Sequence, residues 1–108
     1  MKMKVFKTGN VFLVTVEEIQ FMIKIQPHGF QSTVIREGEP VEVENVSAQE
    51  DELLELVHEK LLELMLNEIS GKLFPNSEEL VNLLDDMLNE NNLEEVVKEG
   101  MNASKYIH

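Results

Sequence analysis

The sequence predicts an α+β protein: an N-terminal antiparallel sheet of four to five strands in meander order, packed on one face by two or three C-terminal helices. Residues 1–46 are rich in Val, Ile, Phe and Thr with turn residues at short intervals, which is typical of hairpin-connected strands. Residues 47–100 instead repeat apolar residues at helical spacing between capping signals. At 108 residues the chain is expected to form one domain, 1–108, with residues 101–108 as a fraying tail.

The first hairpins predict their own register. Gly9-Asn10 suits a two-residue turn. A loop at Glu17-Glu18 would join the next pair, although Glu-Glu is poor turn chemistry and a longer loop stays open. Both registers bring the same apolar residues to one face, as a sheet with one buried face requires. The strands are predicted over 2–8, 10–17 and 19–26. The shared face carries Met3, Val5, Phe12, Val14, Val16, Ile19, Phe21 and Ile23.

The opposite face of these strands is predicted to be mostly polar. It carries a small apolar patch of Phe6, Leu13 and Met22. Scattered apolar residues on a solvated sheet face are ordinary, so a contact site there is the less favoured interpretation.

Two further strands are expected. Pro27 and Gly29 favour a turn, and a strand follows at about 30–36. The last strand, 41–44, is expected to start at Pro40 and to lie at a sheet edge, because proline cannot donate a ladder hydrogen bond. Glu42 and Glu44 on this strand discourage stray edge pairing.

Capping signals then predict three helices. Ser47 and Glu50 form a capping box, and Gly71 suits a helix end, so the first helix is expected over about 48–70. Ser77 caps a second helix that runs to about residue 90, with acidic residues in its first turn. A short third helix is expected from Asn92 to Gly100.

The first helix is more apolar than a surface helix needs to be. Its apolar residues span an arc of about 220°, whereas a surface helix needs a stripe somewhat over about 100° wide. Besides the sheet, a second cover is therefore expected: the later helices, a second copy of the chain, or a partner. His58 and Glu68 also fall inside this arc, where polar groups can set the register of an interface. The candidate interface is Leu54, His58, Leu62, Met65, Leu66, Glu68 and Ile69.

The charge of the chain is unevenly distributed. Residues 1–46 carry five Lys/Arg and six Glu, which gives −1, and residues 47–108 carry four Lys and fifteen Asp/Glu, which gives −11. Such a surface disfavours direct binding to nucleic acid or anionic lipid, because phosphate binding depends on cations. It permits a basic protein partner, although acidic helices also serve solubility alone.

Residue patterns for chemistry are absent from the sequence. There is no cysteine, no HExxH or other metal-ligand spacing, no Gly-rich phosphate loop and no nucleophile motif. We therefore expect no enzymatic activity, no cofactor and no metal. No apolar run reaches the roughly 20 residues that span a bilayer, and the N-terminus does not resemble a signal peptide, which favours a cytoplasmic protein.

These observations favour a small, acidic, non-enzymatic protein-interaction domain that self-associates as a dimer through the apolar surface of helix 48–70. One alternative is an acidic inhibitor, of the type that phages encode, which mimics nucleic acid and occupies a DNA-binding, RNA-binding or defence protein. A further alternative is a small-ligand-binding domain with a pocket between sheet and helices.

Overall fold

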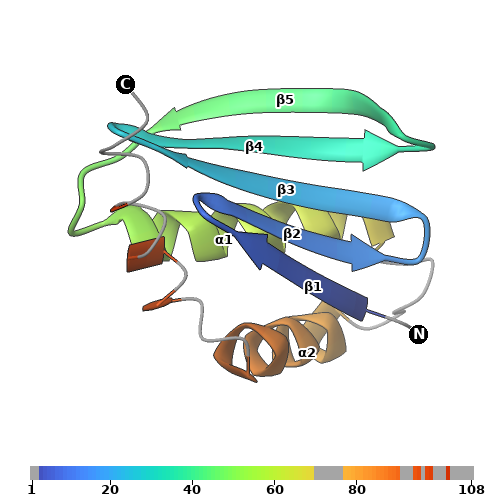
Figure 1. The fold of residues 1–108 in the computed structure, drawn as a ribbon. Helices are drawn as coiled ribbons and strands as arrows, with labels where there is room; N and C mark the ends of the chain where they lie inside the picture. Colours follow the sequence, from blue (N-terminus) through green and yellow to red (C-terminus); the bar gives the residue numbers. More distant parts are fainter. Residues whose placement is uncertain (1–2, 70–76, 91–93, 96, 99–101, 103–108) are drawn as a thin grey trace.

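The computed structural model describes residues 3–69, 77–90, 94–95, 97–98 and 102 (Figure 1). The strands follow one another in the order β1-β2-β3-β4-β5 and every neighbouring pair is antiparallel. The predicted α+β class and meander order are therefore confirmed, and the sheet has five of the predicted four to five strands. The elements are β1 Met3–Thr8, β2 Val11–Val16, β3 Ile19–Gln26, β4 Gly29–Arg36, β5 Glu39–Ser47, α1 Leu53–Ile69 and α2 Ser77–Glu90.

The first two hairpins have the predicted registers. Val5 lies opposite Val14, which in turn lies opposite Phe21. Two residues, Glu17 and Glu18, connect β2 to β3, so the longer loop that their chemistry left open does not form. Alternate residues of β2 are buried, because neighbouring side chains on a strand point to opposite faces.

The short β2–β3 turn holds Glu17 in the left-handed region, with φ 55°. A side chain in this region costs about 1–2 kcal/mol, and glycine avoids that cost. We expect Glu17→Gly to raise the free energy of unfolding by about 0.5–1 kcal/mol, once the added flexibility of the unfolded chain is subtracted. Urea denaturation measures it. Glu18→Gly is the matched control, because Glu18 is outside that region and gains nothing; equal stabilisation by both changes would contradict the prediction.

The end of the sheet and the start of α1 differ from the sequence prediction. β5 continues to Ser47, which pairs with Gly29, and α1 begins only at Leu53. The predicted helix start at 48 and the capping box of Ser47 and Glu50 are therefore wrong. The segment before α1 forms a turn instead: the Gln49 amide donates to Glu52 Oε1 at 3.0 Å, and the Glu52 amide donates to the Gln49 carbonyl at 3.1 Å. Ser47 cannot cap the helix because it belongs to β5 and pairs with Gly29 of β4.

As predicted, β5 is an edge strand, although it starts at Glu39 rather than Pro40. Its pairing shifts between Val34 and Ile35, which face Glu42 and Pro40, so that Val41 is an extra residue in the strand. Such a bulge disrupts the ladder locally and bends the strand.

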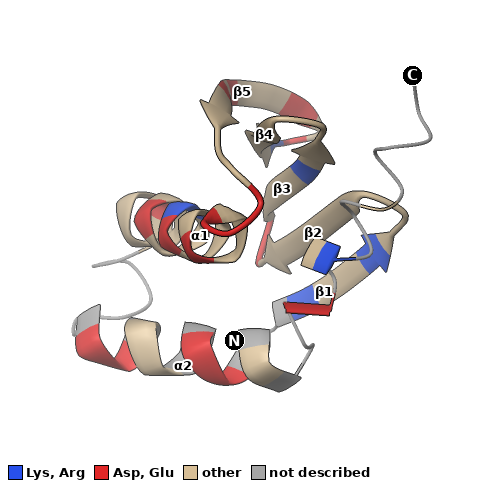
Figure 2. Ribbon diagram, turned by 90° about the vertical axis from the view of Figure 1, so that its left-hand side faces the viewer, with Lys and Arg blue, Asp and Glu red and all other residues tan. Residues whose placement is uncertain are grey.

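One face of the sheet is covered by α1, which packs against β3 and β4 (Figures 1 and 2). α2 lies beside α1, on the side toward β1, and packs against α1 (Figures 1 and 2). Coverage of the sheet by two or three helices is not supported, because α1 is the described helix that covers it. Of the predicted third helix, 92–100, the structure describes only residues 94–95 and 97–98. The helix and sheet share a core in which the largest fully buried side chains include Phe12, Phe21, Phe30, Leu61 and Met65.

Candidate interaction surface

The expected interface on α1 is largely engaged within the chain. Met65 and Ile69 are buried in the core, at 0% and 2% exposure. Leu54, Leu62 and Leu66 are half-buried and pack against the edge of that core. Self-association through this helix stays a prediction. The apolar residues of the expected interface that keep some exposed surface are Leu54, Leu62 and Leu66, which we term the α1 flank.

Both polar residues of the expected interface have partners in the same chain. His58 Nε2 lies 2.8 Å from Asp85 Oδ1, which ties α1 to α2. The Glu68 carboxylate pairs with the Arg36 guanidinium, which ties α1 to β4. These contacts use groups that, from the sequence alone, could have fixed the register of a dimer.

A third ionic contact ties α1 to the edge of the sheet. Lys60 Nζ lies 2.7 Å from Glu44 Oε2 on β5 and 2.8 Å from Glu63 Oε2 on α1. The hydrogen bond to Glu44, followed by that to Glu63, raises the pKa of Lys60 above its usual value. The lysine therefore stays charged and shields β5 from the acidic outer face of α1.

The Arg36–Glu68 pair leads to a stability prediction. Glu68 is mostly buried, so removing its partner leaves a poorly solvated carboxylate. We expect Arg36→Met to lower the free energy of unfolding by about 1–3 kcal/mol. The double variant Arg36→Met/Glu68→Met should recover most of that loss in a denaturant titration, because the unpaired charge is gone. A double variant as unstable as the sum of both single changes would contradict this account.

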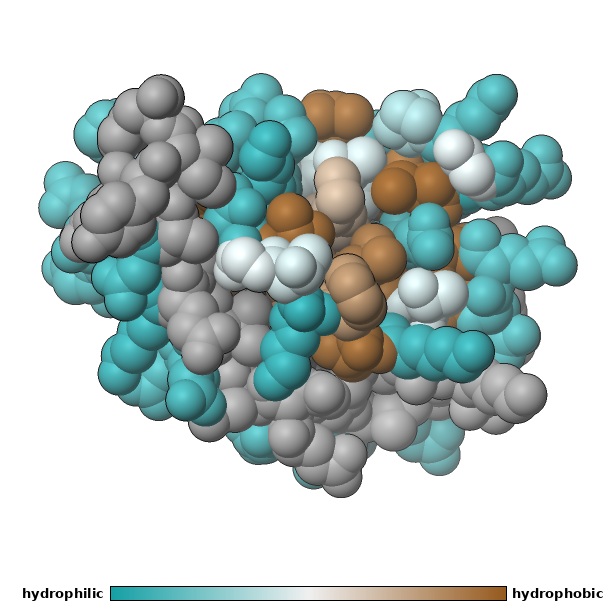
Figure 3. Space-filling model, in the orientation of Figure 1, coloured by the Kyte–Doolittle hydropathy of each residue, from teal (hydrophilic) through white to brown (hydrophobic). Residues whose placement is uncertain are grey.

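The opposite side of the sheet, here called the open face, carries an apolar row that crosses all five strands. Successive strand pairings align one residue from each strand: Phe6, Leu13, Met22, Thr33 and Val43. We call these residues the open-face row. Phe6 is 60% exposed and Val43 is 53% exposed, and Leu13 and Met22 are half-buried. Figure 3 looks onto this side and shows apolar side chains gathered over the middle of the sheet.

The rows beside it contain no carboxylate and are mostly polar or cationic, with Ile35, Pro40 and Val11 as their apolar members. One side is Lys4, Thr15, Gln20, Ile35 and Pro40, and the other is Thr8, Val11, Lys24, Gln31 and Asn45. Within the described strands, Lys4 and Lys24 are the charged residues whose register places them on the open face. Acidic residues lie elsewhere: Figure 2 shows them, in red, spaced along α1 and α2, with others on β5, in the segment before α1 and at residues 94–95. The open face is thus apolar at its centre and weakly cationic, in a chain of net charge −12.

Thr33, at the centre of strand β4, is the one polar member of the row. It is 4% exposed, and its Oγ1 has no hydrogen-bond partner among the described residues. A buried hydroxyl without a partner costs about 1–3 kcal/mol. We expect Thr33→Val, which keeps the shape and the β-branch, to raise the free energy of unfolding by about 1 kcal/mol. Thr15→Val on the half-buried neighbouring row is the control; a gain there as large as at Thr33 would contradict the explanation.

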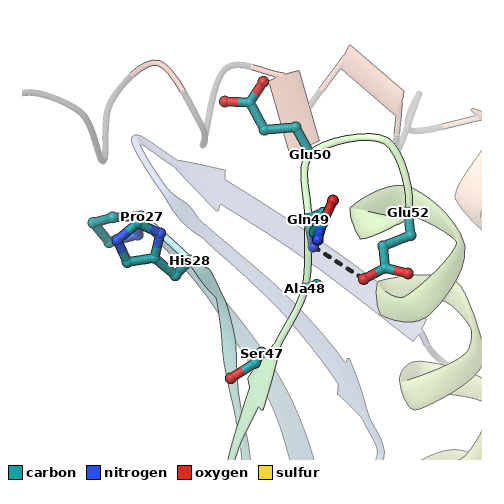
Figure 4. A pocket seen from close by; sticks show the side chains of 7 residues that line it. All are labelled: Pro27, His28, Ser47, Ala48, Gln49, Glu50 and Glu52. Carbon is teal, nitrogen blue, oxygen red and sulfur yellow. Dashed lines mark hydrogen bonds between the residues drawn. The ribbon is translucent and has the colours of Figure 1, made fainter.

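A shallow, open hollow of about 540 Å³ lies where the β3–β4 turn meets the segment before α1 (Figure 4). Pro27 and His28 form one wall and Gln49, Glu50 and Glu52 the other. Glu52 accepts a hydrogen bond from the Gln49 amide rather than turning toward His28. The hollow has the volume of a ligand site but lacks the enclosed apolar lining that such sites have. Among the described residues, no group of three His, Asp or Glu side chains is placed to hold a metal ion.

Sequence reasoning identified Phe6, Leu13 and Met22 as a patch but not its extension to Val43 and the neighbouring Ile35. Those two residues join it only through the β3–β4 and β4–β5 registers.

Comparison with protein-family models, curated proteins and solved structures finds no match for this chain. Neither α1 nor α2 has the length and apolarity to cross a membrane.

Proposed function

We propose that this chain is a small, acidic, non-enzymatic protein-interaction domain whose contact surface is the open face of its sheet. The open-face row supports the proposal, because an exposed apolar patch rimmed by polar residues marks an interaction site. Phe6 and Val43 leave more than half of their surface in water, and a partner would remove that surface at a gain of about 25 cal/mol per Å². The α1 flank is the weaker surface, since its leucines are already half-buried.

Affinity capture from the cells that express the chain tests this proposal. Wild-type protein and a Phe6→Ser/Val43→Ser variant are immobilised and the retained proteins compared by quantitative mass spectrometry. We expect the variant to lose specific proteins that the wild type retains, because the two most exposed apolar side chains of the open-face row, one at each end, are gone. A Leu62→Ser variant probes the α1 flank in parallel. Identical retention by wild type and the open-face variant would overturn the proposal.

A second function, mimicry of nucleic acid, draws support from the outer face of α1. Glu55, Glu59 and Glu63 are exposed at four-residue spacing, so the carboxylates lie in line about 6 Å apart along the helix. Such a line offers negative charge to a cationic groove, although Lys60 already neutralises part of the charge at Glu63.

An arginine-rich peptide probes this second function. We expect neutralising all three residues to glutamine to weaken binding of the peptide at least tenfold more than neutralising Glu17, Glu18 and Glu37, which are exposed in turns. Equal weakening would mean that only the total charge matters, which would exclude mimicry by α1.

A further inference from the structure

We infer that the occupant of the open face is a second copy of this chain, stacked sheet to sheet on the first. This inference rests on the proposed function and names its partner. It differs from the expectation drawn from the sequence, which placed self-association on α1.

The distribution of charge is the first argument for a second copy. Two chains of net charge −12 repel one another, and most of that charge lies in residues 47–108. Contact through the helical side would bring carboxylates such as Glu55 and Glu59 against their counterparts. The open face carries no carboxylate in its strands, and stacking it on itself leaves both acidic sides pointing outward. It is therefore the side on which self-association meets least repulsion.

The edge strand β5 is unsuited to joining two sheets side by side. Pro40 lacks an amide donor, the bulge at Val41 interrupts the ladder, and Glu42 and Glu44 add charge along the strand. Each of these features blocks edge-to-edge pairing. Side-by-side pairing of two sheets through the β5 edge is therefore disfavoured.

The area of the open face is sufficient for a dimer. Five strands spaced about 4.8 Å apart, each about six residues long at about 3.4 Å per residue, cover a flat footprint of about 490 Å². Two copies together bury about 1,000 Å² of surface, calculated for flat faces without the added area of protruding side chains. That value lies at the lower limit for a biological interface, about 1,000 Å² in total, which is the size of weak or transient complexes.

A two-fold axis along the open-face row would satisfy both the apolar and the charged groups. Each member of the row then meets its own counterpart, so that Phe6 stacks near Phe6 and Val43 near Val43 of the second copy. Rotation about this axis exchanges the two flanking rows. Lys24 therefore lies opposite Gln20, and Lys4 opposite Thr8, so like charges do not meet.

Sedimentation velocity over a dilution series tests the inference on the full chain. We expect wild type to dimerise, and Val43→Lys and Phe6→Lys each to raise the dimer Kd at least tenfold. Lysine is chosen because it lowers the net negative charge, so added repulsion between the acidic chains cannot explain a loss of dimer. Asn67→Lys, at an exposed position on α1, is the matched control for charge and should dimerise as wild type. Circular dichroism checks that each variant is folded; both substituted side chains are already more than half exposed.

Salt distinguishes the second copy from an acidic partner. Raising the ionic strength from about 0.05 M to about 0.5 M should strengthen a dimer of acidic chains, because the repulsion between them is screened, and should weaken binding of an acidic protein to Lys4 and Lys24. A wild type that stays monomeric, or a dimer that Leu62→Ser disrupts and Val43→Lys does not, would overturn the inference. If the wild type is monomeric but the Phe6→Ser/Val43→Ser variant still loses captured proteins, the proposed function stands and only the second copy is excluded.

Discussion

Replacement of Gly29 by alanine is expected to lower the free energy of unfolding by about 3 kcal/mol or more. Gly29 opens β4 with φ 150°, a conformation that L residues rarely adopt. A Cβ atom at this position would overlap the Val46 carbonyl oxygen and lie 2.9 Å from its carbon. Both neighbours are backbone atoms of the paired strand β5, so no side chain can turn aside to make room.

The clash would reach the helix as well as the sheet. Gly29 pairs with Ser47, and the next residue, Ala48, donates its amide to the His28 carbonyl at 3.0 Å. These two contacts direct the chain from β5 toward α1. Moving β5 away from Gly29 therefore also displaces the start of the helix that covers the core.

Gly38→Ala is the matched control for the alanine substitution at Gly29. Gly38 also has a positive φ, 79°, but an added Cβ would meet no heavy atom within 4 Å. Only the backbone strain remains there, about 1 kcal/mol. Urea denaturation of both variants separates strain from clash, and equal losses at the two positions would show that the close approach of β5 is unimportant.

The second large effect is expected at Leu61, which is fully buried between α1 and the sheet. Leu61→Ala removes buried methyl groups and leaves a cavity, which costs about 2–5 kcal/mol. The adjacent Leu62 is half-buried on the α1 flank, and Leu62→Ala should cost only about 1 kcal/mol. The difference between the two losses in free energy of unfolding shows how much more of Leu61 than of Leu62 is covered within the single chain.

Denaturant titrations at two protein concentrations make this comparison decisive. We expect the loss at Leu62 to stay near 1 kcal/mol at both concentrations, because only its own chain covers it. A loss at Leu62 as large as that at Leu61, increasing with concentration, would show that a second copy covers the α1 flank and would favour the interface first expected from the sequence.

The β1–β2–β3 meander could be predicted in detail because its determinants are local. Gly9-Asn10 and Glu17-Glu18 join strands that are neighbours in sequence, and apolar alternation selects one register for each pair. The start of α1 could not be predicted in the same way. Ser47 has a good capping side chain, but its backbone is committed to Gly29, eighteen residues earlier, and only the assembled sheet reveals that pairing.

The candidate site likewise has a part that local sequence predicts and a part that depends on pairing between distant segments. Its apolar members on β1 to β3 were visible as alternating residues, whereas Val43 joins them only after a bulge has shifted the β4–β5 pairing. Likewise, Glu68 and His58 read as unpaired groups on a helix face until Arg36 on β4 and Asp85 on α2 approach them.

The sequence by itself determined the α+β class, the order of the strands, the buried face of the first three and the concentration of negative charge in the second half. Those properties follow from composition and short-range periodicity, which act between residues close together in the chain. Only the tertiary structure decided where the helix begins, which of its apolar and polar groups are satisfied within the chain, and that an apolar row without carboxylates crosses the whole open face. Each of these depends on pairing between distant segments, and alternation along one strand says nothing about which residue of another strand will lie beside it.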